Sequence, residues 1–246
     1  MIILIDVGNT EVKIGFADGG VILQKFRITT DRNLSSDAYY LLINPFIKNQ
    51  HIDKVAIASV VPPVTKALKE VFIKYYQIQP LVIGPGIKTG INVKTDYPKE
   101  VGADLICAVA GVKSEPTPVL IVDLGTATKY IFMEKATIKG VIITPGVMIS
   151  MRAMVSNTAL LPDFDLEVPA KVLGTNTIAC MQSGVTYGVA AQVDGLIERI
   201  RKEVGQPFKV VMTGGLSEII EPLCHTKLER DENLVLRGLL DILLKN

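Results

Sequence analysis

One strand-and-turn sequence occurs twice in this chain, near the start of each half. Residues 3–10 read ILIDVGNT and residues 120–127 read LIVDLGTA. Each copy is an apolar, β-branched run that ends in Asp-x-Gly, which is typical of a buried strand followed by a tight turn. The repetition predicts an internal duplication, although two buried strands could also end alike by chance.

The segments that follow each copy support a duplication. After the first copy, strands are expected at 12–17, 20–28, 54–60 and 80–84, and helices at 35–49, 64–76 and 102–112. After the second, strands are expected at 126–134, 136–144 and 209–215, and helices at 147–155, 177–204 and 233–245. Each half thus contains three strands in succession and then helices. We therefore expect an α/β protein with two domains, residues 1–114 and 115–246.

Composition restricts the classes of partner. The formal net charge is +1 and no long run of one sign occurs, which gives a nucleic-acid partner no electrostatic support. No uninterrupted apolar stretch approaches the roughly 18 residues of a membrane span. Three widely spaced cysteines suit reduced thiols in the cytoplasm better than disulfides. The high mean hydropathy favours apolar surface buried against another subunit, although a tight core would explain it almost as well.

The two Asp-x-Gly turns have the composition of a nucleotide site. Asp6 and Asp123 end buried strands, where a carboxylate is costly unless it is paired or lies beside a cation. Carboxylate and phosphate oxygens together commonly hold Mg²⁺, and turn amides with nearby hydroxyls bind anions. Lys13 lies on the strand after the first turn and could reach a phosphate. Either turn alone could equally be a hairpin with a turn-forming aspartate, but two copies favour a nucleotide.

A third carboxylate lies at the start of an apolar helical segment. Asp104 follows Gly102 and would occupy the first turn of the helix at 102–112. It could be a simple N-cap, which is common for aspartate at this position. If it faces the phosphates, it is a general base for a hydroxyl nucleophile. The long loop before it carries Tyr97, which could close over a ligand.

Other nucleotide, metal and hydrolase motifs are absent from the sequence. It contains no G-x-x-x-x-G-K-[ST] loop, no G-x-G-x-x-G turn that opens a helix and no G-x-S-x-G elbow. Its two histidines, His51 and His225, lack the spacing of zinc ligands.

Several motifs together resemble those of type III pantothenate kinases. The chain contains, in the family's order and over nearly its whole length, DVGNT, SVVPP, YPKEVGAD, DLGTAT, TPG, TALLP, GTNT, MQSG and TGG. The resemblance implies two ribonuclease H-like domains of the actin-like ATPase superfamily, with mixed sheets and with ATP between them. It also implies a cytoplasmic homodimer that phosphorylates the primary hydroxyl of pantothenate with ATP, Mg²⁺ and a monovalent cation, K⁺ or NH₄⁺, in the first step of coenzyme A biosynthesis.

The resemblance also assigns roles to individual residues. Asp104 would be the catalytic proton acceptor, Asp6 would hold Mg²⁺ and Asp123 would hold the monovalent cation. The residues implied to bind ATP are Asp6, Val7, Gly8, Asn9, Thr10, Glu11, Val12, Lys13, Thr126, Gly214 and Gly215. The residues implied to bind pantothenate are Tyr97, Gly102, Ala103, Asp104, Leu105 and Thr177, the last of these across the dimer interface.

Three departures from the family pattern concern the substrate side and the second turn. Leu105 follows GAD where the family usually has arginine, Asn157 stands where an arginine often precedes Thr-Ala, and Lys129 follows DLGTAT where a small or hydroxylated residue is usual. Lys129 could replace a lost positive charge. Leu105 leaves two alternatives open, a related kinase for another small hydroxy acid and a non-catalytic ATP-binding homologue. An Hsp70-like or actin-like ATPase is disfavoured because the chain is too short for the extra subdomains of those proteins.

Overall fold

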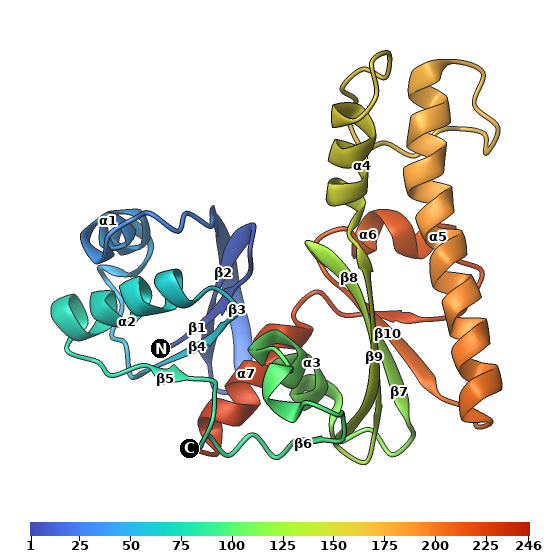
Figure 1. Cartoon of the computed structure of the whole chain (residues 1–246). Coiled ribbons are helices and arrows are strands. Elements are labelled where there is room, and N and C mark those ends of the chain that lie inside the picture. The colour runs from blue at the N-terminus through green and yellow to red at the C-terminus, as the bar shows by residue number, and fades with distance from the viewer. The chain divides into compact units, whose positions relative to one another are not determined.

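The computed structural model describes residues 1–246, which form two compact units (Figure 1). The first unit contains Met1–Ser114 together with Asn233–Asn246, and the second contains Glu115–Glu232. None of the helices combines the length and the apolarity that a membrane crossing requires. The three cysteines are free.

The sheet of the first unit has the strand order β3-β2-β1-β4-β5. The strands are β1 (Ile2–Val7), β2 (Glu11–Asp18), β3 (Val21–Thr29), β4 (Lys54–Ser59) and β5 (Leu81–Val82). The first three pair antiparallel, whereas β4 runs parallel to β1. Because the connection from β3 to β4 passes through a helix, the parallel pairing has the crossover that it needs.

The second unit repeats this arrangement. Its strands are β7 (Val119–Leu124), β8 (Ala127–Glu134), β9 (Thr137–Pro145), β10 (Lys209–Thr213) and β11 (Glu229–Arg230), in the order β11-β10-β7-β8-β9. Here β7, β8 and β9 form the antiparallel meander and β10 lies parallel to β7. Both meanders shift register at the same place, after Phe16 in β2 and after Phe132 in β8. The predicted duplication and mixed-sheet α/β fold are therefore confirmed.

Helices cover both faces of the first sheet. They are α1 (Ser36–Ile47), α2 (Pro62–Tyr76), α3 (Ala103–Val112) and α7 (Leu234–Leu244), with a 3₁₀ turn at Pro98–Glu100 and the short strand β6 (Asn92–Val93) before α3. The Ser35 side chain caps α1 by accepting from the Ala38 N–H at 3.2 Å. One apolar core lies between the sheet and α1 and α2, and another lies between the sheet and α3 and α7.

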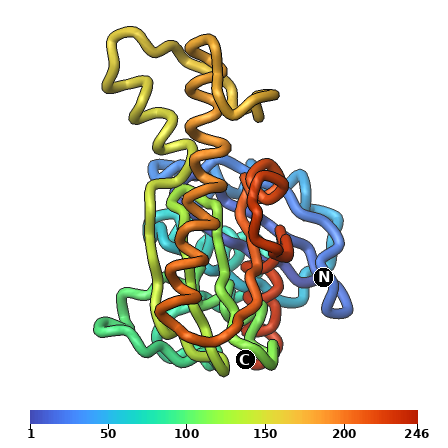
Figure 2. Tube along the Cα trace, turned by 90° about the vertical axis from the view of Figure 1, so that its right-hand side faces the viewer, coloured from blue at the N-terminus to red at the C-terminus, as the bar shows by residue number.

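The helices of the second unit are α4 (Val147–Ser156), α5 (Thr177–Val204) and α6 (Ser217–Ile220), followed by a 3₁₀ turn at Glu221–Leu223. The middle and C-terminal part of α5 supplies Val193, Ile197 and Ile200 to the core against β7, β8 and β10. Figures 1 and 2 both show α4 and the first turns of α5 rising beyond the sheet of this unit. There a small cluster around Val147, Met151 and Val185 holds the two helices together.

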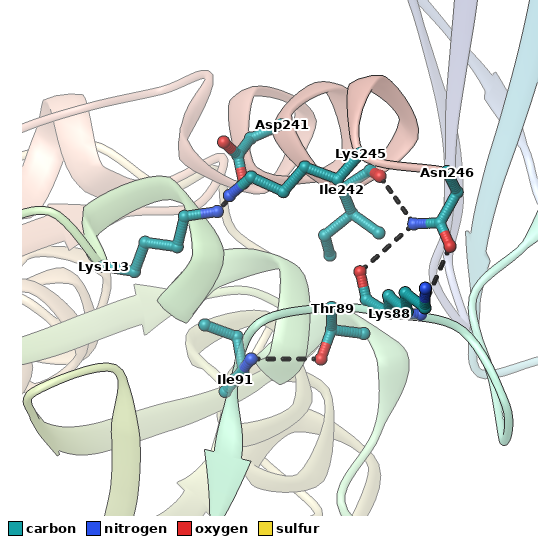
Figure 3. Close-up of polar contacts among 8 residues, drawn as sticks. All are labelled: Lys88, Thr89, Ile91, Lys113, Asp241, Ile242, Lys245 and Asn246. Carbon is teal, nitrogen blue, oxygen red and sulfur yellow. Dashed lines mark hydrogen bonds and ion pairs between the residues drawn. The ribbon is translucent and has the colours of Figure 1, made fainter.

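The last helix, α7, belongs to the first unit, although the sequence analysis placed residues 115–246 together in the second domain. Its residues Leu236, Leu239 and Leu243 fill the core beneath β1 and β4. Figure 3 shows that Asp241 near the end of α7 contacts the ammonium group of Lys113, which directly follows α3 in the same unit. Asp241 also contacts the ammonium group of Lys245 at the end of α7 itself. The Asn246 amide also donates to the Lys88 carbonyl at 3.1 Å. Sequence order alone could not reveal which sheet this apolar helix would cover.

Candidate active site

Hydrogen bonds hold the β1–β2 turn in place, and the residues at its tip are exposed to solvent. The Gly8 N–H donates to the Glu11 carbonyl at 2.9 Å, and the Thr30 hydroxyl donates to the Gly8 carbonyl at 2.7 Å. Arg32 donates to the Asn9 side chain at 2.8 Å. Residues 9–11 are exposed at the turn, whereas Val7 and Val12 are buried beneath it. The turn is thus a fixed, open loop of the kind that can bind phosphates. Arg32 carries no motif that could have identified it from the sequence.

Asp6 is the charged residue of this turn that is buried. Its side chain is 8% exposed, and it lies opposite Lys13 in the antiparallel pair and beside Ala58 of β4. Because side chains alternate along a strand, Asp6 shares the face of Leu4, which α3 and α7 cover. The carboxylate therefore lies at the edge of the core beneath α3.

Asp104 lies in the first turn of α3, and its carboxylate folds back over Gly102. Its Oδ1 accepts from the Leu105 N–H at 2.9 Å. A β-carbon at Gly102 would lie 2.4 Å from this Oδ1 and 3.3 Å from a methyl group of Val60. Since real contacts of 2.4 Å do not occur, only glycine leaves this space for the carboxylate. Gly102 is the N-cap residue of α3, so Asp104 is not the simple N-cap that the sequence left open.

Asp6 and Asp104 approach the same buried thiol. Cys107, one turn along α3 from Asp104, is completely buried. Burial raises the pKa of the Cys107 thiol well above its ordinary value, and the negative charges of Asp6 and then Asp104 raise this pKa further. The two carboxylates that the sequence assigned to magnesium and to proton acceptance therefore lie on the same face of the first unit.

A groove of about 520 Å³ adjoins this corner. Val60, which crowds Gly102, also lines the groove, together with Ser59 and Thr65. The Thr65 hydroxyl donates to the Ser59 hydroxyl at 2.6 Å. Lys66 and Lys69, on the first turns of α2, give the groove a positive charge. Sequence analysis missed both lysines because a charged helix face is usually only a solvated surface.

The other residues that were expected to bind the substrate differ in how far they are exposed to solvent. Tyr97 is 70% exposed, whereas Leu105 is 8% exposed. Ala103 and Gly102 are partly buried at the start of α3. Thr177 is exposed and belongs to the second unit, where it is the first residue of α5. A buried leucine cannot pair with an anionic substrate group, so any such pairing would fall to other side chains.

In the second unit, three backbone segments meet at the β7–β8 turn. A β-carbon at Gly146, just before α4, would lie 2.2 Å from the Thr126 carbonyl oxygen. One at Gly214 would lie 2.5 Å from the Leu124 carbonyl carbon, and Gly214 has a φ of 98°, which favours glycine. The TPG and TGG motifs thus pack directly on the DLGTAT turn. Thr126 and Gly214 therefore both lie at this turn, and Gly215 directly follows Gly214. That these residues bind ATP stays a prediction.

Asp123 at the end of β7 has an ion-pair partner. The Lys129 ammonium lies 3.1 Å from Asp123 Oδ2, and the two side chains are 17% and 14% exposed. From the sequence, Lys129 could replace a lost positive charge. In the structure its ammonium forms an ion pair with Asp123. A carboxylate whose charge an ammonium already neutralises fits a further monovalent cation less well than an unpaired one.

Comparison with known proteins gives a consistent assignment. The family model described as type III pantothenate kinase matches residues 2–199. A protein of Acholeplasma laidlawii named type III pantothenate kinase is 50% identical over 246 residues, covering 100% of this chain and 99% of its own.

Solved structures share the fold at much lower identity. A conserved putative Baf family transcriptional activator from Campylobacter jejuni has a TM-score of 0.61 at 19% identity, covering 99% of this chain and 98% of its own. A ROK family glucokinase from Streptomyces griseus has a TM-score of 0.57 at 13% identity, covering 98% and 97%. Both likenesses extend over the duplicated units described above.

Proposed function

This chain belongs to the type III pantothenate kinase family and transfers a phosphoryl group from ATP to pantothenate, and we propose that Asp104 is the base of that reaction. The observation that carries this assignment is the space at Gly102, which only a glycine leaves for the Asp104 carboxylate. In the reaction, the primary hydroxyl oxygen of pantothenate bonds to the γ-phosphorus of ATP. The bond from that phosphorus to the β–γ bridging oxygen breaks, ADP leaves, and Asp104 accepts the hydroxyl proton.

The phosphates of ATP are proposed to lie along the open β1–β2 turn. Hydrogen bonds from Thr30 and Arg32 hold this turn in place. Lys13 is the direct partner of Asp6 in the antiparallel β1–β2 pair. Both observations support this placement. Thr126, Gly214 and Gly215 of the second unit are also proposed to contact ATP; Thr126 belongs to the β7–β8 turn, and Gly214 packs on Leu124 beside it. Each set keeps its atoms in place before the nucleotide arrives, which lowers the ordering cost of binding.

Mg²⁺ is proposed to bind at Asp6. A carboxylate at the edge of an apolar core fits a hard cation, and Mg²⁺ is usually held by one or two carboxylates with substrate phosphates and water. Bound there, the ion would neutralise charge on the phosphoryl oxygens. The monovalent cation expected at Asp123 fits less well, because the ammonium of Lys129 contacts that carboxylate.

The carboxylate of pantothenate is proposed to meet Lys66 and Lys69, because Leu105 is buried and uncharged where the family usually has arginine. Pantothenate would then extend from Asp104 into the adjoining groove.

Replacing both Lys66 and Lys69 by alanine should raise KM for pantothenate and leave KM for ATP unchanged. An unchanged KM for pantothenate would remove the two lysines from the site.

A homodimer is proposed to form through α4, the start of α5 and the segment between them. Several apolar side chains are exposed there, among them Met148, Ile149, Leu160, Val172 and Leu173. Thr177, at the first turn of α5, would then contact pantothenate of the other subunit. A cytoplasmic location is in keeping with the three free cysteines.

The base assignment is tested with Asp104→Asn in a coupled assay of ADP formation with and without pantothenate. Because asparagine cannot accept the proton, turnover should fall by about 100-fold or more. ATP affinity, measured by calorimetry, should stay within a few fold. The control is Asp18→Asn at the exposed end of β2, which should behave as the wild type. Normal turnover by Asp104→Asn would exclude this carboxylate as the base.

A further inference from the structure

The ion pair between Asp123 and Lys129 is fixed by the strand register. The two residues are direct partners in the antiparallel β7–β8 pair, two positions from the turn, and therefore point to the same face. The Nζ–Oδ2 distance is 3.1 Å and less than one fifth of either side chain is exposed. Flexible surface pairs lack this combination of register, contact and partial burial.

The carboxylate of Asp123 lies against the β7–β8 turn. A β-carbon at Gly125 would lie 3.5 Å and 3.7 Å from the two Asp123 oxygens, which is ordinary van der Waals contact distance. The same turn carries Thr126, whose carbonyl packs on Gly146 at the start of α4. The positive charge that Lys129 places at Asp123 therefore lies beside the backbone segments that are proposed above to contact ATP.

We propose that the Lys129 ammonium takes the place of the activating monovalent cation, so that this kinase works without K⁺ or NH₄⁺. This inference rests on the proposed function of the second turn and specifies its cation. A primary ammonium carries the same charge as K⁺ and NH₄⁺ and can donate to the same carboxylate oxygens. Because it is tethered six residues from Asp123, its local concentration greatly exceeds that of a dissolved ion. Because the ammonium already neutralises the charge of Asp123, a free cation would gain much less by binding there than at an unpaired carboxylate.

The proposal is tested by measuring pantothenate-dependent turnover in KCl and in tetramethylammonium chloride at equal ionic strength. Wild-type rates should agree within about twofold. Lys129→Ala should be slower by about tenfold or more without K⁺ and should recover when K⁺ or NH₄⁺ is added, because Asp123 then becomes open to a free cation. The proposal is overturned if the wild type itself needs K⁺, or if Lys129→Ala keeps its rate in tetramethylammonium.

Thermal unfolding without substrates provides a second readout that does not depend on turnover. A cation that binds only the folded protein raises Tm, so Lys129→Ala should gain a K⁺-dependent rise of about 3 °C or more that the wild type lacks. The matched control is Lys139→Ala, which removes the more exposed pair with Glu134 at 3.6 Å and should gain no such rise. A rise in the wild type as large as that in Lys129→Ala would overturn the proposal. If neither protein turns over pantothenate but only Lys129→Ala gains the rise, the proposed function fails and the cation replacement stands.

Discussion

At the scale of single residues, Gly102 decides where the carboxylate of Asp104 can lie. A methyl group at this position would meet Oδ1 at 2.4 Å and would press on Val60. Gly102→Ala should therefore turn the carboxylate away and lower kcat by about tenfold or more, since a misplaced base loses most of its effect. KM for ATP should hardly change.

Steady-state kinetics of Gly102→Ala and Gly84→Ala check this expectation. Gly84 has nothing within 4 Å of the added carbon and no positive φ, so its variant should retain the wild-type kcat. Equal kcat values for the two variants would mean that the position of Asp104 does not depend on the space at Gly102.

The sequence suggested the residues of the proposed site but not all of their contacts. The Asp-x-Gly turns stood out because an aspartate at the end of a buried strand is costly. Aspartate at the start of a helix is common, so the role of Asp104 was indicated mainly by the resemblance of the GAD motif to the family. The pair of Asp123 and Lys129 was not foreseen, because it depends on the exact register across the β7–β8 turn. The burial of Leu105 depends on how α3 packs, which the sequence does not state.

At the scale of elements, α3 and α7 cross with their backbones in close contact. A β-carbon at Gly238 of α7 would lie 1.8 Å from the Cys107 carbonyl oxygen, and one at Gly111 of α3 would lie 2.6 Å from the Leu234 carbonyl oxygen. These contacts hold the helix that carries Asp104 against the last helix of the chain. The C-terminal segment thus supports the proposed base without lying near it in sequence.

Gly238→Ala should destabilise the protein by about 3 kcal/mol, because overpacking against a backbone cannot be relieved by a side-chain rotation. Urea unfolding measures this difference. Gly195→Ala, within α5 and with open space around it, should instead raise stability by up to about 1 kcal/mol through helix propensity. A Gly238→Ala protein as stable as the wild type would show that the two helices can separate without cost.

The regular elements were largely predictable, because the central strands are apolar, β-branched runs and the long helices have apolar residues at helical spacing. The short elements were not, among them β11, α6 and the two 3₁₀ turns, because two to four residues carry too little pattern. The placement of α7 was also missed. Its apolar side chains could have covered either sheet, and the choice depends on contacts with α3 that lie more than a hundred residues away in sequence.

At the scale of the whole molecule, the proposed dimer depends on the apolar side chains that α4 leaves exposed. Met148 and Ile149 are each 43% exposed, in the part of the second unit that rises beyond its sheet (Figure 2). Replacing both by glutamate should convert a dimer into a monomer, because charges in the middle of an apolar interface are strongly unfavourable. Light scattering after gel filtration measures the mass of both proteins.

The control for this change is Val21→Glu with Leu23→Glu on β3 of the first unit, where both side chains are 61% exposed. This variant should keep the wild-type mass. A wild type that elutes as a monomer at micromolar concentration, or a dimer that survives the two glutamates on α4, would remove this surface as the subunit interface.

The central claim is that this chain phosphorylates the primary hydroxyl of pantothenate. Phosphorus NMR of a reaction containing ATP, Mg²⁺, pantothenate and the wild-type protein tests it most directly, because each product has its own signal. A new phosphomonoester signal should grow together with ADP and should be coupled to the protons of the pantothenate CH₂–O group. Formation of ADP with inorganic phosphate alone, or no consumption of ATP by a folded protein that binds it, would contradict the account.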